Sequence, residues 1–227
     1  MNLSGGIDSA LVARLSRDAL GPDRVLGLLL PDARHPTALL EETAAYAEEL
    51  GIEHRTIPID PIERAFVAAL PATRDRVDLG NVKARIRMTI AYAWARPLRR
   101  LVAGTGNRSE LELGYFTKYG DGGVDLLPIG GLYKTQVRAL ARSLGLPKSI
   151  LDRPPTAGLW EGQTDEGELG LAYEQIDRVL NAFADGVSDA DAARSTGVPV
   201  DDVARLRTRQ RDSAHKRRLP PIPPPNP

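Results

Sequence analysis

The sequence predicts an α/β fold built on a doubly wound parallel sheet, and two observations support this prediction. Short apolar runs, such as residues 25–30, alternate with longer amphipathic segments, such as residues 37–50. Uniformly apolar strands are typical of a parallel sheet that helices cover on both faces. In addition, the glycine-rich residues 4–9 lead directly into a helix, as phosphate-binding loops do. Because only residues 1–3 precede this loop, we expect the sheet to lack its first strand.

The expected elements follow from apolar periodicity and from the glycines and prolines that end each run. In chain order they are a helix over 9–17, a strand over 25–30, a helix over 37–50, a strand over 54–59, helices over 60–70 and 82–95, a strand over 101–104, a short strand or extended loop at 126–129, and a helix over 133–144. Glycine or proline follows most of these helices, as expected at helix ends.

The composition changes after Ile150. Residues 152–163 are typical of a loop, and helices are expected over 165–181, 189–196 and 200–217. The proline-rich residues 220–227 are expected to be extended. We therefore divide the chain into an α/β nucleotide-binding domain over 1–160, a helical extension of the same domain over 161–219, and a tail over 220–227.

Composition excludes several classes of function. The 227 residues carry a net charge of +0, so no global field attracts nucleic acid or a membrane surface. No apolar run is long enough to span a bilayer and no signal peptide is visible, which indicates a cytoplasmic protein. With Cys 0, the chain has no thiol to release ammonia from glutamine, no persulfide carrier and no cysteine-ligated metal.

Residues 4–9 read SGGIDS and predict a site for a nucleotide pyrophosphate. Gly5 and Gly6 allow a tight turn and a close approach of backbone N–H groups to an anion, and Ser4 and Ser9 add hydroxyl donors. Asp8 would repel phosphate unless a cation lies between them, so we expect it to bind Mg²⁺. The alternative is an ordinary serine–glycine turn that caps a helix.

Two later loops extend the predicted site. Glu110 follows the expected strand at 101–104 and begins a helix, so its carboxylate is a second candidate ligand for Mg²⁺. It could instead only favour a helix N-terminus. Residues 115–125 combine Lys118, Asp121 and Asp125 with glycines and aromatic residues, which is too polar for a core. The alternative there is a solvated surface loop.

Longer segments resemble the NAD⁺ synthetases, in their ammonia-dependent form, within the PP-loop ATP pyrophosphatases. They are residues 4–9, 81–88, 104–134, 153–157, 162–166 and 215–217, so the resemblance covers almost the whole chain from Leu3 to about Pro221. It implies a Rossmann-like fold of the adenine nucleotide alpha hydrolase type. It also implies that ATP, as co-substrate, adenylates deamido-NAD⁺ and that ammonia converts the adenylate to NAD⁺, releasing AMP and pyrophosphate.

The resemblance also implies roles for individual residues. ATP binding is expected at Ser4, Gly5, Gly6, Asp8, Ser9, Thr105, Lys134 and Thr156, and Mg²⁺ binding at Asp8 and Glu110. The dinucleotide is expected to bind at Arg85, Lys118, Asp125, His215 and Lys216. The expected catalytic residues are Lys134, which counters phosphate charge, and Asp121, which orients ammonia or takes its proton. Members of the family are homodimers, so we expect a homodimer with the dinucleotide site near its interface.

Other interpretations remain open at this point. The chain could be another PP-loop amide ligase, such as the ATPase domain of a GMP synthetase, or the synthetase part of a glutamine-dependent NAD⁺ synthetase. Residues 191–203 resemble a helix-turn-helix, although the acidic residues around them oppose DNA phosphates, so we expect no nucleic-acid partner. A non-catalytic remnant is the last alternative, and it depends only on the missing strand.

Overall fold

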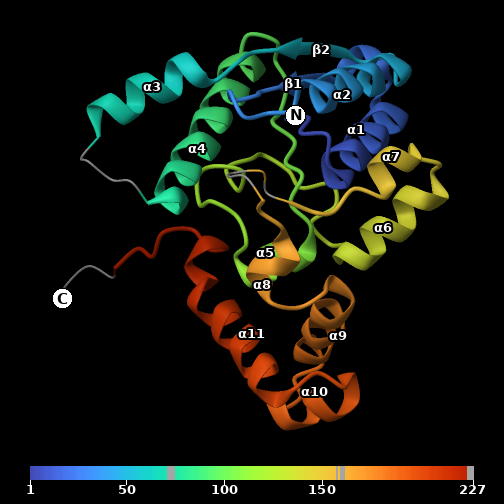
Figure 1. Cartoon of the computed structure of the whole chain (residues 1–227), viewed down its shortest axis with the longest axis vertical. Helices are drawn as coiled ribbons and strands as arrows, with labels where there is room; N and C mark the ends of the chain where they lie inside the picture. Colours follow the sequence, from blue (N-terminus) through green and yellow to red (C-terminus); the bar gives the residue numbers. More distant parts are fainter. Residues whose placement is uncertain (71–74, 157, 159–161, 224–227) are drawn as a thin grey trace.

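The computed structural model describes residues 1–70, 75–156, 158 and 162–223 (Figure 1). The first half contains α1 (Ile7–Leu20), β1 (Leu26–Leu29), α2 (Thr37–Glu49), β2 (Glu53–Thr56), α3 (Asp60–Ala69) and α4 (Arg76–Ala95). The second half contains α5 (Arg108–Leu113), α6 (Lys134–Ser143), α7 (Lys148–Leu151), α8 (Asp165–Leu169), α9 (Tyr173–Ala184), α10 (Asp189–Thr196) and α11 (Val200–Asp212). Short 3₁₀ turns lie at Pro22–Arg24 and Ala214–Lys216.

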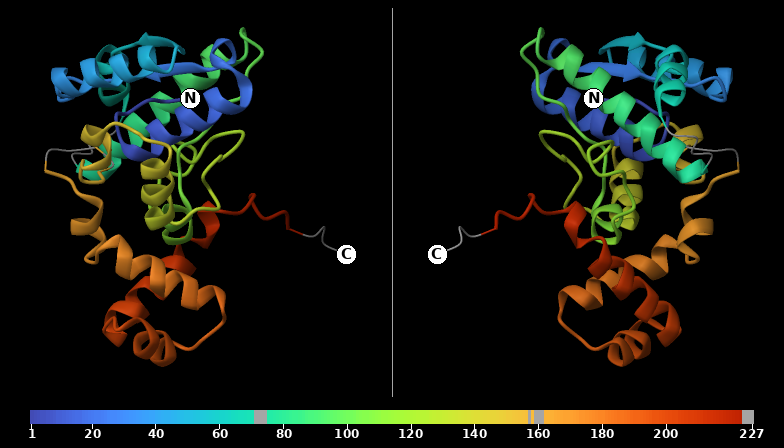
Figure 2. Two further views of the ribbon diagram at one scale, coloured as in Figure 1. Left: turned by 90° about the vertical axis from the view of Figure 1, so that its right-hand side faces the viewer. Right: turned by 90° about the vertical axis from the view of Figure 1, so that its left-hand side faces the viewer.

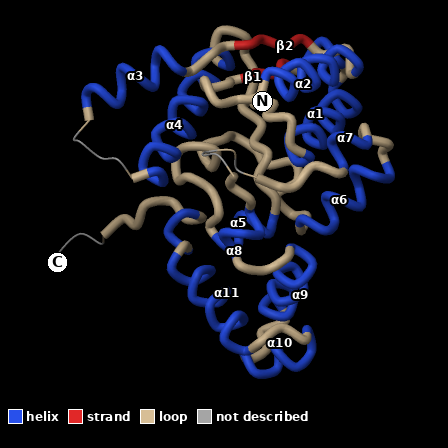
Figure 3. Tube along the Cα trace, in the orientation of Figure 1, coloured by secondary structure: helices blue, strands red, loops and turns tan. Residues whose placement is uncertain are grey.

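The sheet is small and parallel, and Figure 3 shows its two strands side by side at one end of the molecule. β1 pairs with β2 from Leu26 opposite Glu53 to Leu29 opposite Thr56. On the other side of β1, Asn2 forms a parallel bridge with Leu28. We expected the sheet to lack its first strand. Among the described residues, this single bridge lies at the place of that strand.

Helices cover both faces of β1, which confirms the predicted α/β class. Leu29 packs into a core with residues of α1, α2, α6 and α7, whereas its neighbours Leu28 and Leu30 pack with residues of α4 on the opposite face. All four residues of β1 are buried. Each fully buried leucine side chain stabilises the fold by about 1.5–3 kcal/mol relative to an exposed one.

A third core joins the C-terminal helices to the rest of the molecule. It contains residues of α9, α10 and α11 together with Leu113 of α5 and Tyr133, which precedes α6. Figure 1 shows α9, α10 and α11 as a group below the sheet region, with α5 and α8 between them. The predicted helical extension therefore packs directly on the elements that carry Glu110 and Lys134.

Several predicted element boundaries are wrong. The expected strand at 101–104 is only an isolated bridge between Ala103 and Leu126, because the backbone turns into a loop directly after it. α4 begins at Arg76 rather than 82, since the Asp75 side chain accepts a hydrogen bond from the Val77 N–H and caps the helix. The expected helix over 165–181 is two helices, α8 and α9, because Gly170 has φ +74° and ends the first.

The chain end has little regular structure where the structure describes it. The expected helix over 200–217 ends at Asp212, and the 3₁₀ turn Ala214–Lys216 follows. Figure 2 shows the chain beyond this turn running away from the helices. Residues 220–223 form neither helix nor strand, and residues 224–227 lie outside the described part. Among the described helices, none is long and apolar enough to cross a membrane.

Candidate active site

Residues 4–9 form a closed turn at the N-terminus of α1. Ser9 Oγ donates to the Gly6 carbonyl oxygen at 2.9 Å and lies 3.2 Å from Ser4 Oγ. α1 begins at Ile7, so its first N–H groups, which have no partners within the helix, lie at this turn. These N–H groups and the positive end of the helix dipole favour an anion such as phosphate.

Gly5 is the position where only glycine fits. Its φ is +79°, and a Cβ built on it would lie 2.5 Å from Thr43 Oγ1 and 2.6 Å from Leu39 Cδ1 in α2. The Arg153 guanidinium donates to the Gly5 carbonyl oxygen and pairs with the Glu42 carboxylate of α2. The sequence analysis gave Arg153 no role. Its two contacts connect the segment before Thr156 to α2 and to the loop of residues 4–9, called the phosphate loop below.

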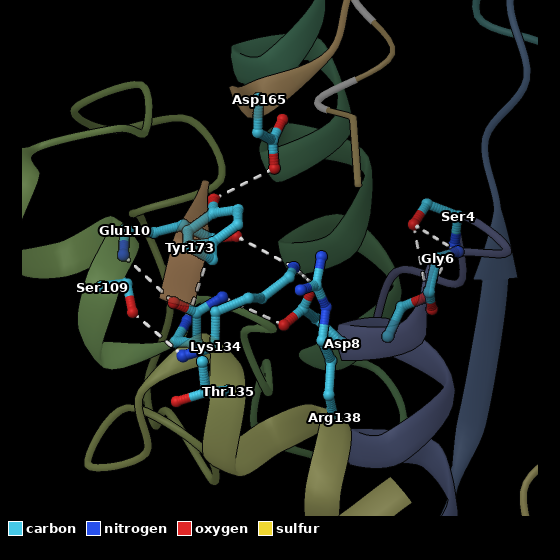
Figure 4. Close-up of polar contacts among 12 residues, drawn as sticks. Ser4, Gly6, Asp8, Ser109, Glu110, Lys134, Thr135, Arg138, Asp165 and Tyr173 are labelled. Carbon is cyan, nitrogen blue, oxygen red and sulfur yellow. Dashed lines mark hydrogen bonds and ion pairs between the residues drawn. The ribbon is translucent and has the colours of Figure 1, made fainter. Parts of the chain in front are cut away.

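Asp8, Lys134 and Glu110 meet beside this turn (Figure 4). Lys134 is the first residue of α6 and is 1% exposed, and its ammonium group contacts the Asp8 carboxylate and lies 3.7 Å from Glu110 Oε1. Asn107 links the two acids: its Nδ2 donates to Asp8 at 3.0 Å, and its Oδ1 accepts from the Glu110 N–H at 3.0 Å. The structure thus brings together the three charged residues that the sequence predicts for phosphate and metal binding.

The charges of this cluster depend on one another. Burial and the nearby Asp8 charge raise the pKa of Glu110 to about 8. Burial alone would lower the pKa of Lys134, but the Asp8 and Glu110 carboxylates outweigh it and raise that pKa. Lys134 therefore stays charged at neutral pH, in a place where little water screens it.

The cluster fits a magnesium ion. The Asp8 and Glu110 carboxylates face the same ammonium group, so the site already accommodates positive charge between two hard oxygen ligands. Mg²⁺ at nucleotide sites is commonly held by one or two carboxylates plus phosphate oxygens. No group of three or more His, Cys, Asp or Glu residues that could hold a metal ion occurs in the described part of the chain.

Two buried side chains that the sequence interpretation missed line the same cluster (Figure 4). The Tyr173 ring lies 5.4 Å from Lys134 Nζ, and its hydroxyl donates to Asp165 Oδ2 at 3.1 Å. Burial raises the pKa of Asp165. Asp165 lies within residues 162–166, which carry the family resemblance, and this was the one sign in the sequence that it belongs to the site. Nothing in the sequence indicated Tyr173.

Asp121 lies in the loop 115–125, where its carboxylate accepts from the Thr117 N–H at 2.8 Å. Desolvation of the carboxyl group raises its pKa, although the residue as a whole is exposed. A raised pKa is the shift that a carboxylate needs in order to accept a proton near neutral pH. The hydrogen bond from Thr117 gives Asp121 a structural role in closing the loop. Its role toward ammonia stays a prediction.

The predicted dinucleotide residues are mostly gathered at one place. The Arg85 guanidinium donates to the Lys118 carbonyl oxygen at 3.3 Å, and Lys118 Nζ lies 3.4 Å from His215 Nδ1. Lys216, next in the chain, donates to the carbonyl oxygens of Gly114 and Phe116, each at 2.7 Å. Lys216 therefore fastens the C-terminal turn to the loop that carries Lys118.

Asp125 is held away from this basic group. Its carboxylate accepts from the Val102 N–H at 2.7 Å and from the Tyr92 hydroxyl of α4 at 3.0 Å. The two threonines predicted to contact ATP lie on loops: Thr105 is half-buried before α5, and Thr156 is exposed. Thr156 Oγ1 accepts from the Gly158 N–H at 3.1 Å. The roles of these three residues stay predictions.

Known proteins resemble the chain over almost its full length. The profile of the family described as NAD synthase matches residues 1–220. The NH(3)-dependent NAD(+) synthetase of Methanosarcina mazei is 50% identical over 226 residues, which are 98% of this chain and 88% of that protein.

Two solved structures are similar in fold as well. The NMN synthetase of Francisella tularensis has a TM-score of 0.86 and 40% identity, covering 98% of this chain and 87% of that one. The NH3-dependent NAD synthetase of Campylobacter jejuni, in complex with the nitrate ion, has a TM-score of 0.82 and 34% identity, with the same coverage of 98% and 87%. With its phosphate loop and its Asp8–Lys134–Glu110 cluster in place, the chain belongs to the NAD synthase family.

Proposed function

We propose that this chain amidates deamido-NAD⁺ to NAD⁺ with ATP and ammonia. The nicotinate carboxylate attacks the α-phosphorus of ATP and pyrophosphate leaves, after which ammonia attacks the acyl carbon and AMP leaves. Adenylation is needed because a carboxylate is a poor electrophile until its oxygen becomes part of a good leaving group. The observation that carries the proposal is the Asp8–Lys134–Glu110 cluster at the phosphate loop of a chain in this family.

The residues of the cluster divide the work of the first step. Ser4, Gly5, Gly6 and Ser9 would surround the ATP phosphates, and Lys134 would offset the charge that develops on the leaving pyrophosphate. Asp8 and Glu110 would hold Mg²⁺, which, when bound, neutralises phosphate oxygens as a Lewis acid. Thr105 and Thr156 lie on the loops that would contact the rest of ATP.

The second step needs neutral ammonia. Asp121, with its raised pKa, would orient ammonia or accept the proton that it loses on attack. The chain has no cysteine, so it has no thiol for the covalent release of ammonia from glutamine, which favours free ammonia as the substrate. Water must be kept from the adenylate during this step, because hydrolysis would waste it.

The basic group of Arg85, Lys118 and His215 would bind the negatively charged nucleotide substrate. A mononucleotide is a second candidate for this substrate, because the solved structure of an NMN synthetase is similar to this chain at a TM-score of 0.86. That name indicates a mononucleotide product. The dinucleotide remains our proposal, because the chain is 50% identical to an NH(3)-dependent NAD(+) synthetase and 40% identical to the NMN synthetase.

The experiment that separates the two is a comparison of kcat/KM for deamido-NAD⁺ and nicotinic acid mononucleotide, with ATP, Mg²⁺ and ammonium in excess. We expect the dinucleotide to be preferred, and we expect Lys118→Ala to raise its KM without changing the KM of ATP. Arg211→Ala removes a similar charge as a control, because Arg211 is exposed and pairs with its neighbour Asp212. Preference for the mononucleotide in the wild type would overturn the assignment.

Three further proposals concern the protein as a whole. Residues 1–160 and 161–219 form one catalytic domain and its helical extension, since α5 and the C-terminal helices share a core.

The chain forms a homodimer through α3 and α4, which expose the apolar residues Phe66, Val67, Val77, Tyr92 and Trp94. We expect a cytoplasmic location, where all three substrates would be present. Sedimentation of the wild type and of Val77→Glu tests the dimer, because an exposed glutamate there should favour monomers.

A further inference from the structure

Asp177 is a buried carboxylate outside the predicted site that uses both of its oxygens. It lies in α9 and is 5% exposed. Its Oδ1 accepts from Ser109 Oγ at 2.5 Å, and its Oδ2 accepts from the Thr135 N–H at 2.8 Å. A buried carboxylate is tolerated when its oxygens are hydrogen-bonded in this way.

Ser109 continues the network to Lys134. Its hydroxyl donates to Asp177, and the same oxygen accepts from the Lys134 N–H at 2.9 Å. Ser109 is 0% exposed and directly precedes Glu110 in α5. Asp177 therefore connects α9 to the residue before Glu110 and to the backbone of Lys134.

The network completes the N-terminus of α6. The first N–H groups of a helix have no partners within it, and the residue before α6, Tyr133, makes no side-chain cap there. Ser109 and Asp177 accept the N–H groups of the first two residues of α6, Lys134 and Thr135. A carboxylate at this end also interacts favourably with the helix dipole. These contacts fix the backbone from which the Lys134 side chain extends to Asp8.

We propose that Asp177, acting through Ser109, is a positioning residue that sets Lys134 and Glu110 for adenylation. The inference rests on the proposed function of the cluster and extends it to the helical region, which then takes part in catalysis as well as in folding. Small displacements of catalytic groups reduce rates strongly, by roughly 100-fold for about 1 Å. Substrate binding at Arg85, Lys118 and His215 involves none of these contacts.

The test compares Asp177→Asn and Ser109→Val with Ser109→Thr, which has the shape of valine but keeps the hydroxyl. We expect kcat to fall by about 10- to 100-fold in D177N and S109V, with the KM of deamido-NAD⁺ within about two-fold of the wild type. S109T should retain most of the activity. The rise in melting temperature caused by ATP with Mg²⁺, measured without the other substrates, should shrink in the same two variants.

Ser188→Ala is the control for stability alone. Ser188 caps α10 in the same helical region, where its Oγ accepts from the Asp191 N–H at 3.2 Å, and removing it costs about 1 kcal/mol. We expect S188A to melt at a lower temperature with kcat unchanged. Unchanged kcat in D177N at a lowered melting temperature, or equal activity of S109V and S109T, would make the network purely structural and overturn the proposal. If D177N does not fold, the S109V and S109T pair decides alone.

Failure of the proposed function gives a different result. In that case the wild type forms no NAD⁺. The positioning role can then still be tested, by comparing the ATP-induced rise in melting temperature between the wild type and the variants. A wild type that turns over beside variants with unchanged kcat refutes only the positioning role.

Discussion

The buried ammonium group of Lys134 and the partly buried carboxylate of Asp8 form an ion pair that joins the first turn of α6 to the first turn of α1. The two residues are 126 positions apart in the chain. Breaking a buried pair by removing one partner is strongly destabilising, because it leaves an uncompensated charge. The same ion pair therefore contributes to the stability of the fold and sets the charge beside the phosphate loop.

Asp8→Asn tests the metal-binding role of Asp8. We expect kcat to fall by about 100-fold or more, because the amide keeps the shape and can still accept from Asn107 but has no negative charge for Mg²⁺. The melting temperature should change little, because loss of the Asp8 charge favours ionisation of Glu110, which then serves as the counterion of Lys134. Initial rates across a Mg²⁺ titration measure the effect. Turnover within about two-fold of the wild type would refute the assignment.

Lys134→Met tests the role of the cation in stability. Asp8 and Glu110 would then face each other without a counterion, and we expect a loss of about 3–5 kcal/mol at neutral pH. Burial and the nearby Asp8 charge raise the folded pKa of Glu110 above its unfolded value, so part of the lost stability returns as the pH falls and Glu110 is protonated. Urea unfolding at pH 5 and pH 8 measures this difference.

Lys148→Met provides the matched control for that experiment. Lys148 also pairs with an aspartate, Asp152, but its side chain is 86% exposed, so its loss should cost less than about 1 kcal/mol at either pH. A K134M variant that loses equal stability at pH 5 and pH 8 would show that carboxylate repulsion is not the cause.

Glu110 gives a prediction for the pH dependence of the metal-free protein. Its folded pKa is about 8, against about 4.3 in an unfolded chain, so the folded state binds more protons between these values. Its contribution to stability is present below about pH 4 and is lost as the pH rises toward 8, with a slope of up to about 1.4 kcal/mol per pH unit. Glu110→Gln should flatten this slope in unfolding experiments with a chelator present, and identical slopes would contradict the raised pKa.

Gly5→Ala tests the geometry of the phosphate loop. A Cβ would be strained at φ +79° and would collide with Thr43 and Leu39, so we expect a loss of about 1–3 kcal/mol together with weaker ATP binding. Gly21→Ala is the control, because Gly21 has φ +85° but nothing within 4 Å of its Cβ position. It should show the backbone strain alone and keep the affinity for ATP, as measured by calorimetry. Equal ATP affinity of G5A and G21A would refute the role of the loop.

The sequence predicted the parts of the molecule that local pattern determines. The apolar run that contains β1 and the glycine turn before α1 can each be recognised from a few residues. The position of Glu110 after the run at 101–104 indicated its carboxylate, and the resemblance added Lys134. The strand expected at 101–104 was wrong because an apolar run alone does not show whether a neighbouring segment will pair with it. Gly170 split an expected helix because a single positive-φ residue outweighed the acidic start and apolar periodicity around it.

The rest of the site could not be predicted because it depends on contacts between distant segments. Ser109 and Asp177 are 68 residues apart, and neither stands out in its own helix. Tyr173 reads as an ordinary core aromatic, and only the fold shows its ring beside Lys134 Nζ. Arg153 likewise reaches Gly5 across 148 residues. Periodicity describes one element at a time, whereas each of these contacts joins two segments that are far apart in the sequence.

The measurement that tests the central claim most directly is the product balance of the wild-type protein with ATP, Mg²⁺, ammonium and deamido-NAD⁺. NAD⁺, AMP and pyrophosphate are followed together. We expect the three to appear in equal amounts and none to form when deamido-NAD⁺ is omitted. ADP and phosphate in place of AMP and pyrophosphate, or no NAD⁺ from folded protein, would contradict it.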